Sequence, residues 1–359
     1  MTKEEFEKLL VWSVENKASD IHLKVGARPI VRIDGILHSL KTPVLKPEDL
    51  NVVARRVLEG RHSKISPAEI DDLDIPFQLP GVSRYRVNLF RQRGNLSLVL
   101  RIIPTEVPTL DQLGLPPILK KVCEETHGFI LVTGATGSGK SSTLAAMIRH
   151  INEREPVHIV TIEDPIEFVH QDIRSTISQR EVGADTAGFN QALRASLRQD
   201  PDVILVGEIR DHETVDTALK AAETGHLVLS TVHTPDAAKT IGRLMALFPP
   251  DEQDLVRQRL ADNLRATISQ RLLRRADGKG RVVAIEVMIV TGTVQEWLLS
   301  MDKPSTIRDI IEKSRSQYGM MTFDQCLTDL YNGGLVTLEE AKAAATHPAD
   351  FVRALHFEG

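Results

Sequence analysis

The sequence contains few cysteines, few aromatic residues and no long apolar stretch. Its 359 residues include only two cysteines, which excludes a four-cysteine metal site and indicates no disulfide framework. No uninterrupted apolar run approaches the ~18 residues that a membrane-spanning helix needs. Residues 1–5 lack the basic and then apolar pattern of a signal peptide, so we expect a cytoplasmic protein.

Positive charge and base-stacking side chains are also scarce. A net charge of −5 and an aromatic content of 4% give little attraction to nucleic acids, so no nucleic-acid partner is expected. One local basic cluster stands out: Arg271, Arg274, Arg275, Lys279 and Arg281. We interpret this cluster as the C-terminal end of a helix followed by an Asp277-Gly278 turn, because cations there complement the helix dipole.

Residues 1–103 predict a small α+β domain with an antiparallel sheet. Thr2 and Glu5 form a capping box for a first helix, and residues 47–58 predict a second helix. One hairpin is expected to turn at Asp34-Gly35, and a second joins residues 85–90 to residues 96–103. Prolines punctuate residues 104–117, which we interpret as a linker.

The pattern changes after the linker. Short, continuously apolar strands are expected at residues 129–133, 157–162, 203–206 and 227–232, with helices between them. Continuous apolarity indicates strands covered on both faces, so residues 118–290 predict an α/β domain with a parallel sheet. Residues 291–359 are expected to form a C-terminal helical region.

A phosphate-binding loop follows the first of these strands. The segment fits G-x-x-x-x-G-K-[ST], and we expect it to bind a nucleoside triphosphate through Gly134, Ala135, Thr136, Gly137, Ser138, Gly139, Lys140, Ser141 and Ser142. Its glycines allow backbone N–H groups to face the phosphates, Lys140 can reach the β- and γ-phosphates, and Ser141 can offer its hydroxyl to Mg²⁺.

Two later strands end in carboxylates. Glu163 and Glu208 are expected at the carboxyl edge of the parallel sheet, where ligands bind, with Glu208 near the Mg²⁺ shell beside Ser141. Glu163 is then free to act as general base. The alternative is that such residues cap helices, which we prefer for Asp164 and Asp211.

Histidines and arginines provide further candidates. His226 and His233 stand at opposite ends of the fourth strand; most single histidines are structural, and these two either follow that rule or touch the nucleotide. Arg84 and Arg86 share a strand face, and Arg101 lies on the partner strand of that hairpin. They form either a solvated face or arginine fingers for a neighbouring domain or subunit.

These segments together resemble the signature boxes of the secretion-superfamily ATPases. Within that superfamily, the chain resembles the PilT-type twitching motility ATPases, which power type IV pilus retraction. The matching boxes are Walker A at residues 134–141, the Asp box at 161–168, Walker B at 198–208 and the His box at 224–226. Residues 19–23, 179–183 and 269–273 also match, so the resemblance covers nearly the whole chain.

The resemblance implies a PAS-like N-terminal domain, a RecA-like P-loop ATPase core and a homohexamer that binds ATP and Mg²⁺. It also implies that the protein belongs to the type IV pilus machinery and docks on the cytoplasmic side of an inner-membrane platform protein. Family roles match Glu163, Glu208, His226 and His233 in catalysis, and Arg86 and Arg101 as arginines that reach the nucleotide. Arg84 is a weaker match.

One segment departs from the resemblance. Retraction motors carry the motif Ala-Ile-Arg-Asn-Leu-Ile-Arg-Glu, whereas residues 293–300 place Gln295 and Leu299 where the arginines would be. An alternative register at residues 305–312 restores only Arg308. An accessory or diverged retraction or secretion-assembly motor is therefore an alternative. A RecA-like nucleic-acid translocase, which would use the same phosphate loop, is the alternative from another class.

Overall fold

The computed structural model describes residues 1–33, 35–60, 63–104, 106–300 and 304–357. The described chain divides into two compact units. The first comprises Met1–Glu106 with the short segment Glu167–Val169, and the second comprises Val107–Ile166 and His170–Gly359. Each unit has its own hydrophobic core, so each is described separately.

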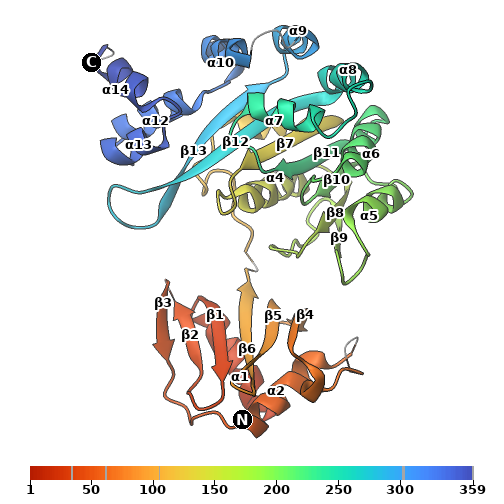
Figure 1. Ribbon diagram of the computed structural model, residues 1–359, viewed down its shortest axis with the longest axis vertical. Coiled ribbons are helices and arrows are strands. Elements are labelled where there is room, and N and C mark those ends of the chain that lie inside the picture. The colour runs from red at the N-terminus through yellow and green to blue at the C-terminus, as the bar shows by residue number, and fades with distance from the viewer. Residues whose placement is uncertain (34, 61–62, 105, 301–303, 358–359) are drawn as a thin grey trace. The chain divides into compact units, whose positions relative to one another are not determined.

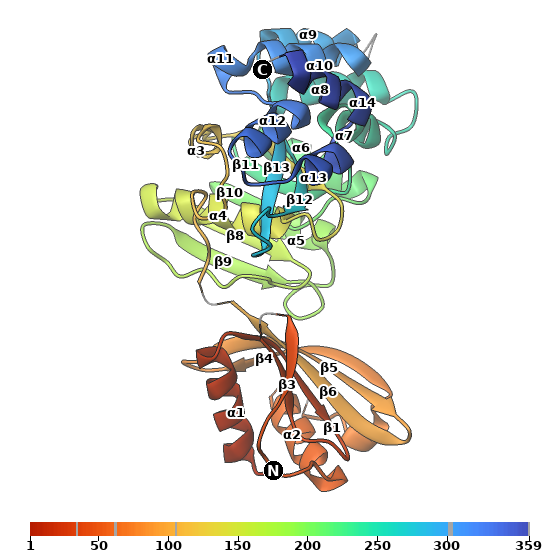
Figure 2. The same cartoon turned by 90° about the vertical axis from the view of Figure 1, so that its left-hand side faces the viewer.

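The first unit is an antiparallel sheet with helices packed on it. Its described strands follow the order β3-β2-β1-β6-β5-β4. Their bounds are β1 (Ala18–Lys24), β2 (Ile30–Ile33), β3 (Ile36–Ser39), β4 (Asp72–Leu79), β5 (Ser83–Gln92) and β6 (Asn95–Ile103). Helices α1 (Lys3–Glu15) and α2 (Pro47–Leu58) bury Phe6, Leu10 and Leu50 against this sheet, and Figure 2 shows α1 lying along it. A short 3₁₀ helix spans Pro67–Glu69.

Most local expectations for this unit agree with the observed elements. The Thr2–Glu5 capping box is present, and α2 has the expected bounds. The second hairpin turns at Arg93 and Gly94, both with positive φ. Of the expected Asp34-Gly35 turn, Asp34 lies outside the described residues. Strand β4 was not expected, because its alternation is interrupted by Pro76; proline is tolerated there since β4 is an edge strand.

The second unit contains a mixed sheet in the order β13-β12-β7-β11-β10-β8-β9. The strands are β7 (Gly128–Gly134), β8 (His158–Glu163), β9 (Thr176–Glu181), β10 (Val203–Val206), β11 (Leu227–Val232), β12 (Leu264–Arg274) and β13 (Arg281–Ile289). β13 runs antiparallel to β12 at one edge, and the other neighbouring pairs are parallel. The predicted α/β fold is therefore confirmed, with an antiparallel strand added at its edge.

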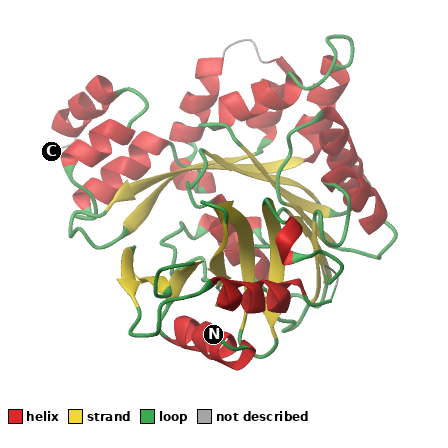
Figure 3. Ribbon diagram, turned by 60° about the horizontal axis from the view of Figure 1, so that its bottom comes forward, coloured by secondary structure: helices red, strands yellow, loops and turns green. Residues whose placement is uncertain are grey.

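Helices cover both faces of this sheet, as Figure 3 shows. Alternate residues of β7 serve the two cores: Phe129 and Leu131 belong to one, and Ile130 and Val132 to the other. The first core includes α5 (Phe189–Ser196), α6 (His212–Glu223), α7 (Ala237–Met245), α8 (Gln253–Asn263), α9 (Gly292–Ser300) and α10 (Pro304–Lys313). The second includes α3 (Ile118–Val122), α4 (Lys140–Arg154), α12 (Phe323–Asn332), α13 (Leu338–Ala344) and α14 (Pro348–Phe357). Between the C-terminal helices lies the short α11 (Arg315–Tyr318).

The basic cluster of the sequence does not end a helix, and that interpretation was wrong. Arg271 and Arg274 lie in β12, and Arg281 begins β13, so the Asp277-Gly278 turn joins two strands. The Arg271 guanidinium stacks on the ring of Phe323 on α12, with 3.8 Å between the guanidinium carbon and the ring centre. Figure 1 shows α12, α13 and α14 gathered beside this hairpin.

None of the helices in the described ranges is both long and apolar enough to cross a membrane.

Candidate nucleotide site

The phosphate loop joins buried strand β7 to α4 in a tight backbone path. Gly134 ends β7 with a φ of 145°, and Gly139 precedes α4 with a φ of 95°. A Cβ atom added at Gly134 would lie 2.4 Å from Ser138 Oγ and 2.6 Å from the Gln270 carbonyl oxygen. Gly134 therefore packs against the Ser138 side chain of its own loop and against the backbone of β12, which only glycine permits at this position.

Two polar groups of the loop are buried at its centre. Lys140 is only 8% exposed, and its ammonium donates hydrogen bonds to the carbonyl oxygens of Gly134 and Ala135, each at 3.0 Å. Ser138 Oγ is buried and has no hydrogen-bond partner among the described residues. An ammonium, an unpartnered hydroxyl and the N-terminus of a 15-residue helix, α4, meet here. This combination fits a phosphate group.

Gln270 supports the loop from β12. Its side-chain amide donates to Thr143 Oγ1 at 2.7 Å, and the whole residue is buried. Its backbone pairs with Gly134 in the parallel register. Gln270 thus touches both the strand that precedes the loop and the helix that follows it. From the sequence, Gln270 was visible only as part of the matching segment 269–273, without a role.

Glu163 and Glu208 reach the same edge of the sheet from neighbouring strands. β8 and β10 pair Ile162 with Val206, and the Gly207 N–H donates to the Ile162 carbonyl oxygen at 2.8 Å. Glu163 therefore ends β8 directly beside the turn that carries Glu208. Glu163 Oε1 accepts hydrogen bonds from Thr161 Oγ1 at 2.7 Å and Gln179 Nε2 at 3.2 Å. Strand order places β11 between β10 and the phosphate-loop strand β7.

Glu208 lies between a guanidinium and an imidazole. Its Oε2 is 2.6 Å from Arg210 Nε and 3.6 Å from His233 Nε2. Burial lowers the pKa of His233 below its ordinary value, and the nearby Lys140 lowers it further despite the opposing effect of Glu208. This shift favours the neutral form of the His233 imidazole. Arg210 was not among the residues expected from the sequence, although its position two residues after Glu208 placed it near the same turn.

His226 lies far from the phosphate loop of its own chain. It precedes β11, whereas His233 follows it, and six strand residues at ~3.3 Å each separate them by roughly 20 Å. His226 Nδ1 lies 2.9 Å from the Ala221 carbonyl oxygen at the end of α6. Parallel strands place their starts and ends at opposite edges of a sheet, so only one of the two histidines can join the phosphate loop.

Asp211 caps α6 by accepting a hydrogen bond from the Thr214 N–H, which agrees with the structural role expected for it.

The candidate arginines lie in the first unit, where Arg86 and Arg101 face each other across β5 and β6. Arg101 Nε donates to Asp20 Oδ1 at 3.0 Å, and Arg86 lies 3.6 Å from Asp74. Asp20 was not singled out from the sequence, although it belongs to the matching segment 19–23.

The donors available for Mg²⁺ are oxygens, as that ion prefers. Ser141 in the first turn of α4 supplies a hydroxyl, and Glu208 supplies a carboxylate. Protein sites for Mg²⁺ beside phosphates use one or two such ligands and complete the shell with water and phosphate oxygens. The described ranges contain no group of three or more His, Cys, Asp or Glu side chains that could hold a metal ion. The residues present therefore fit Mg²⁺ bound together with a nucleotide.

The segment that departs from the retraction-motor motif forms α9. Trp297 is 5% exposed and belongs to the core, whereas Leu299 is 51% exposed. Gln295 Nε2 donates to the Ala261 carbonyl oxygen on α8 at 3.1 Å. In the alternative register, Arg308 on α10 pairs with Asp324 on α12. Trp297 therefore packs in the hydrophobic core, and Leu299 is the apolar side chain of α9 that is exposed to solvent.

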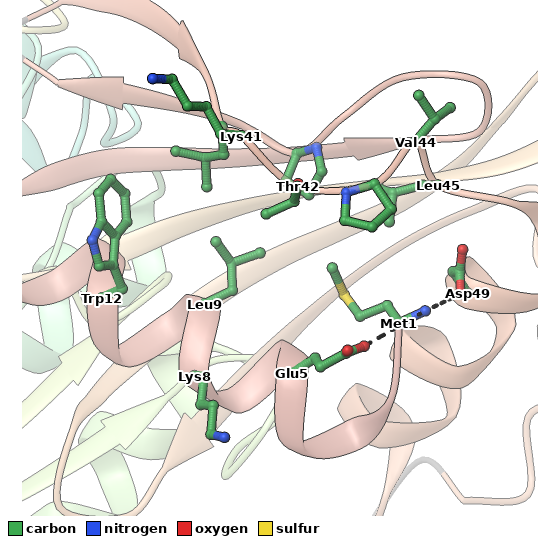
Figure 4. Close-up of a pocket in the computed structure, with 13 residues that line it drawn as sticks. Met1, Glu5, Lys8, Leu9, Trp12, Lys41, Thr42, Val44, Leu45 and Asp49 are labelled. Carbon is green, nitrogen blue, oxygen red and sulfur yellow. Dashed lines mark hydrogen bonds and ion pairs between the residues drawn. The ribbon is translucent and has the colours of Figure 1, made fainter.

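The first unit also contains a pocket of about 470 Å³ between α1 and the segment that follows β3. Figure 4 shows Trp12 and Leu9 of α1 on one side of the pocket and Lys41, Thr42 and Leu45 on the other, with Met1 paired to Asp49. Its lining is mainly apolar and includes none of the predicted site residues.

Comparisons with known proteins agree over the whole chain. Residues 3–351 match the family described as Type II/IV secretion system protein. The type IV pilus retraction ATPase PilT of Pseudomonas aeruginosa is 44% identical over 343 residues, which cover 96% of this chain and 98% of that protein. The type IV pilus ATPase PilU of the same organism is 41% identical over 347 residues, covering 96% and 90%. A crystal structure of the pilus retraction motor PilT with bound ADP superposes with a TM-score of 0.87 at 43% identity, covering 98% of this chain and 99% of the other.

Proposed function

The chain belongs to the type II/IV secretion system protein family, and from this premise we propose that it is a motor that retracts type IV pili by hydrolysing ATP. Its resemblance to the twitching motility ATPases is confirmed, and it is a nucleotide-binding ATPase. One observation carries the proposal: Glu163 at the end of β8 and Glu208 just after the neighbouring strand β10 lie at the edge of the sheet where the phosphate loop begins. Triphosphate binding and water activation are thereby combined in one site.

The phosphate loop binds the triphosphate. The backbone N–H groups of residues 135–141 and the Lys140 ammonium neutralise the β- and γ-phosphates, and the Ser138 hydroxyl donates to a phosphate oxygen. Lys140 exchanges its two carbonyl partners for phosphate oxygens when the nucleotide binds. Gln270 keeps the loop in place during this exchange, because it is bonded to Thr143 in the helix that follows.

Glu163 acts as the general base. It accepts a proton from the attacking water while the water oxygen bonds to the γ-phosphorus, the bond from that phosphorus to the bridging oxygen breaks, and ADP leaves with that oxygen. Thr161 and Gln179 orient the carboxylate by donating to one of its oxygens. Ser141 and Glu208 would hold Mg²⁺, which supplies charge neutralisation on the phosphates when bound. His233 lies beside Glu208 and orients it.

Assembly completes the site. We propose a homohexamer in which Arg86 and Arg101 act on a nucleotide bound mainly by the second unit. The rate of ATP hydrolysis then depends on how the units and subunits are arranged. A catalytic role for His226 requires a nucleotide held by another subunit, because its own chain places it at the far edge of the sheet. The motor works in the cytoplasm, peripherally bound to the inner membrane through a platform protein of the type IV pilus machinery.

Deletion and complementation test this function. Cells that lack this gene should retract pili poorly, the intact gene should restore retraction, and Lys140→Ala should not, although the variant is produced and folded. The purified chain should hydrolyse ATP at the same rate with and without single-stranded DNA. Retraction that is unchanged by the deletion, or a several-fold stimulation by DNA, would instead favour another motor or a nucleic-acid translocase.

A second candidate is an accessory retraction motor, favoured by Gln295 and Leu299 in place of the two arginines of the motif. This change leaves the nucleotide site intact, because α9 carries no residue of that site. The chain alone should then only weakly rescue cells that lack their main retraction ATPase. Gln295→Arg combined with Leu299→Arg should raise that rescue without changing the ATPase rate. Full rescue by the unmodified chain would contradict the accessory role.

A further inference from the structure

Glu286 is a buried carboxyl group that the proposed reaction does not use. It lies in β13, is 8% exposed, and pairs in register with Ser269 of β12. Ser269 in turn accepts a hydrogen bond from Thr133, the residue before Gly134. The pKa of Glu286 is raised to about 7, first by burial and then by Asp236, against the opposing effects of the Ala237 N–H, Arg271 and Arg308. Keeping a carboxyl group in such surroundings is costly, so its contacts call for an explanation.

Its contact is with the first residue of α7. Glu286 Oε1 accepts a hydrogen bond from the Ala237 N–H at 2.9 Å. The N-cap residue Asp236 separately accepts from the Lys239 N–H at 2.8 Å. The start of α7 is therefore capped by its own loop and also tied to another strand, and Figure 1 shows α7 lying beside β12 and β13.

The segment held in this way carries His233. Residues 234–236 connect His233 to Ala237. At the strand end of this connection, Ser230 Oγ donates to the Val206 carbonyl oxygen at 2.6 Å, and Thr231 Oγ1 donates to that of Gly207 at 2.7 Å. Those bonds fasten β11 to the turn that carries Glu208. At the α7 end of the connection, the hydrogen bond from the Ala237 N–H to Glu286 fastens the helix to β13. The position of His233 beside Glu208 therefore depends on the attachments at the β11 end and at the α7 end.

We propose that Glu286 is a positioning residue for ATP hydrolysis, which holds the β11–α7 connection so that His233 stays beside Glu208. This inference rests on the proposed roles of His233 and Glu208. Its physical basis is that displacement of an orienting group by about 1 Å can cost on the order of 10²-fold in rate. Glu286 touches no reacting atom and acts through the backbone of Ala237.

Two substitutions of Glu286 separate positioning from packing. Glu286→Gln keeps an oxygen that can accept from the Ala237 N–H, whereas Glu286→Met has a similar length and no such acceptor. We expect Glu286→Met to lower kcat about tenfold with unchanged affinity for a fluorescent ATP analogue and a melting temperature no lower than that of the parent, and Glu286→Gln to keep kcat within about twofold of the parent value. Unchanged kcat in Glu286→Met, or a parallel loss of kcat, affinity and melting temperature, would overturn the proposal.

A double-mutant cycle shows whether the effect passes through His233. His233→Ala should lower kcat, and adding Glu286→Met should lower it no further, because the group being positioned is already gone. Independent, multiplying losses would overturn the inference while leaving the proposed role of His233 intact. A normal kcat in His233→Ala would overturn both. If Glu286→Met does not fold, Ala237→Pro removes the donor instead, since proline is accepted at the first position of a helix.

Discussion

At the scale of single residues, the two candidate catalytic glutamates differ in what surrounds them. Glu163 Oε1 accepts hydrogen bonds from Thr161 and Gln179, and Glu208 pairs with the guanidinium of Arg210. Their proposed roles also differ: Glu163 accepts the proton of the attacking water, and Glu208 holds the metal ion.

Glu163→Gln should bind ATP normally and hydrolyse it about 10²- to 10⁴-fold more slowly, because the amide cannot accept the proton of the attacking water. Glu208→Gln should instead require more Mg²⁺ for half-maximal activity. Steady-state hydrolysis over a Mg²⁺ titration, with nucleotide binding measured separately, checks both. Exposed Glu155 offers a matched control as Glu155→Gln. Normal turnover in Glu163→Gln with none in Glu208→Gln would show that the roles are reversed.

Gly134→Ala should abolish nucleotide binding and lower the melting temperature. Its new methyl group would lie 2.6 Å from the backbone oxygen of Gln270, so β12 or the loop must move. Gly278→Ala, in the turn between β12 and β13, is the matched control, because its φ of 71° is also unfavourable for alanine but nothing lies within 4 Å of the added atom. It should cost about 1 kcal/mol of stability and retain binding. Equal behaviour of the two variants in calorimetry and nucleotide titration would refute this.

At the scale of elements, the β12–β13 hairpin links the nucleotide side of the second unit to its C-terminal helices. From β12, Gln270 bonds to α4, and Arg271 stacks on Phe323 of α12 and donates to the Ala344 carbonyl oxygen of α13. From β13, Glu286 bonds to the start of α7. One hairpin therefore contacts helices of both layers that cover the sheet.

The burial of Glu286 in β13 should make stability depend on pH. Burial raises the pKa of Glu286 from 4.5 to about 7, with Asp236 adding to the shift and Ala237, Arg271 and Arg308 opposing it. Below about 4.5 the carboxyl is protonated in both folded and unfolded chains. As pH rises towards 7 the unfolded chain ionises first, so the folded state loses stability, by about 3 kcal/mol once both are ionised.

Glu286→Gln removes this titration. Relative to the parent, the variant should gain stability as pH rises from about 4.5 to about 7 and show no further change above that range. Denaturant unfolding of both proteins across these pH values measures the difference. A difference that is constant with pH would mean that the carboxyl keeps its ordinary pKa in the folded protein.

At the scale of the whole molecule, candidate groups for one reaction come from both units. The phosphate loop and the two glutamates belong to the second unit, and Arg86 and Arg101 belong to the first. Asp20 holds Arg101 on the sheet of the first unit through a 3.0 Å hydrogen bond. Arg101 is nevertheless 70% exposed at its side chain, so it is accessible to an anion.

Arg101→Ala should lower kcat by up to about 10³-fold while ATP binding and hexamer assembly persist, because an arginine finger acts on charge that develops during phosphoryl transfer. Arg28→Ala, an exposed arginine in the loop between β1 and β2, is the control and should leave the rate unchanged. Assembly is followed by light scattering and turnover by phosphate release. Hydrolysis at the parent rate in assembled Arg101→Ala would remove this arginine from the mechanism.

Local patterns in the sequence were sufficient for the phosphate loop, the carboxylates at the strand ends and the bounds of α2. Each depends on residues close together in the chain: glycine spacing, a buried run that ends in an acid, or helical periodicity between caps. The buried strands β7, β8, β10 and β11 were found for the same reason.

Tertiary structure decided what depends on residues far apart in the chain. β12 looked like a helix end because its basic residues cluster locally, and only pairing with β7 and β13 makes it a strand. The bonds that Gln270 and Glu286 make join residues 127 and 49 positions apart, so no local pattern could reveal them. The sequence placed His226 and His233 at opposite ends of one strand without choosing between them. The parallel sheet brings only His233, which follows β11, to the edge of the phosphate loop, because parallel strands gather only their carboxyl ends at the nucleotide.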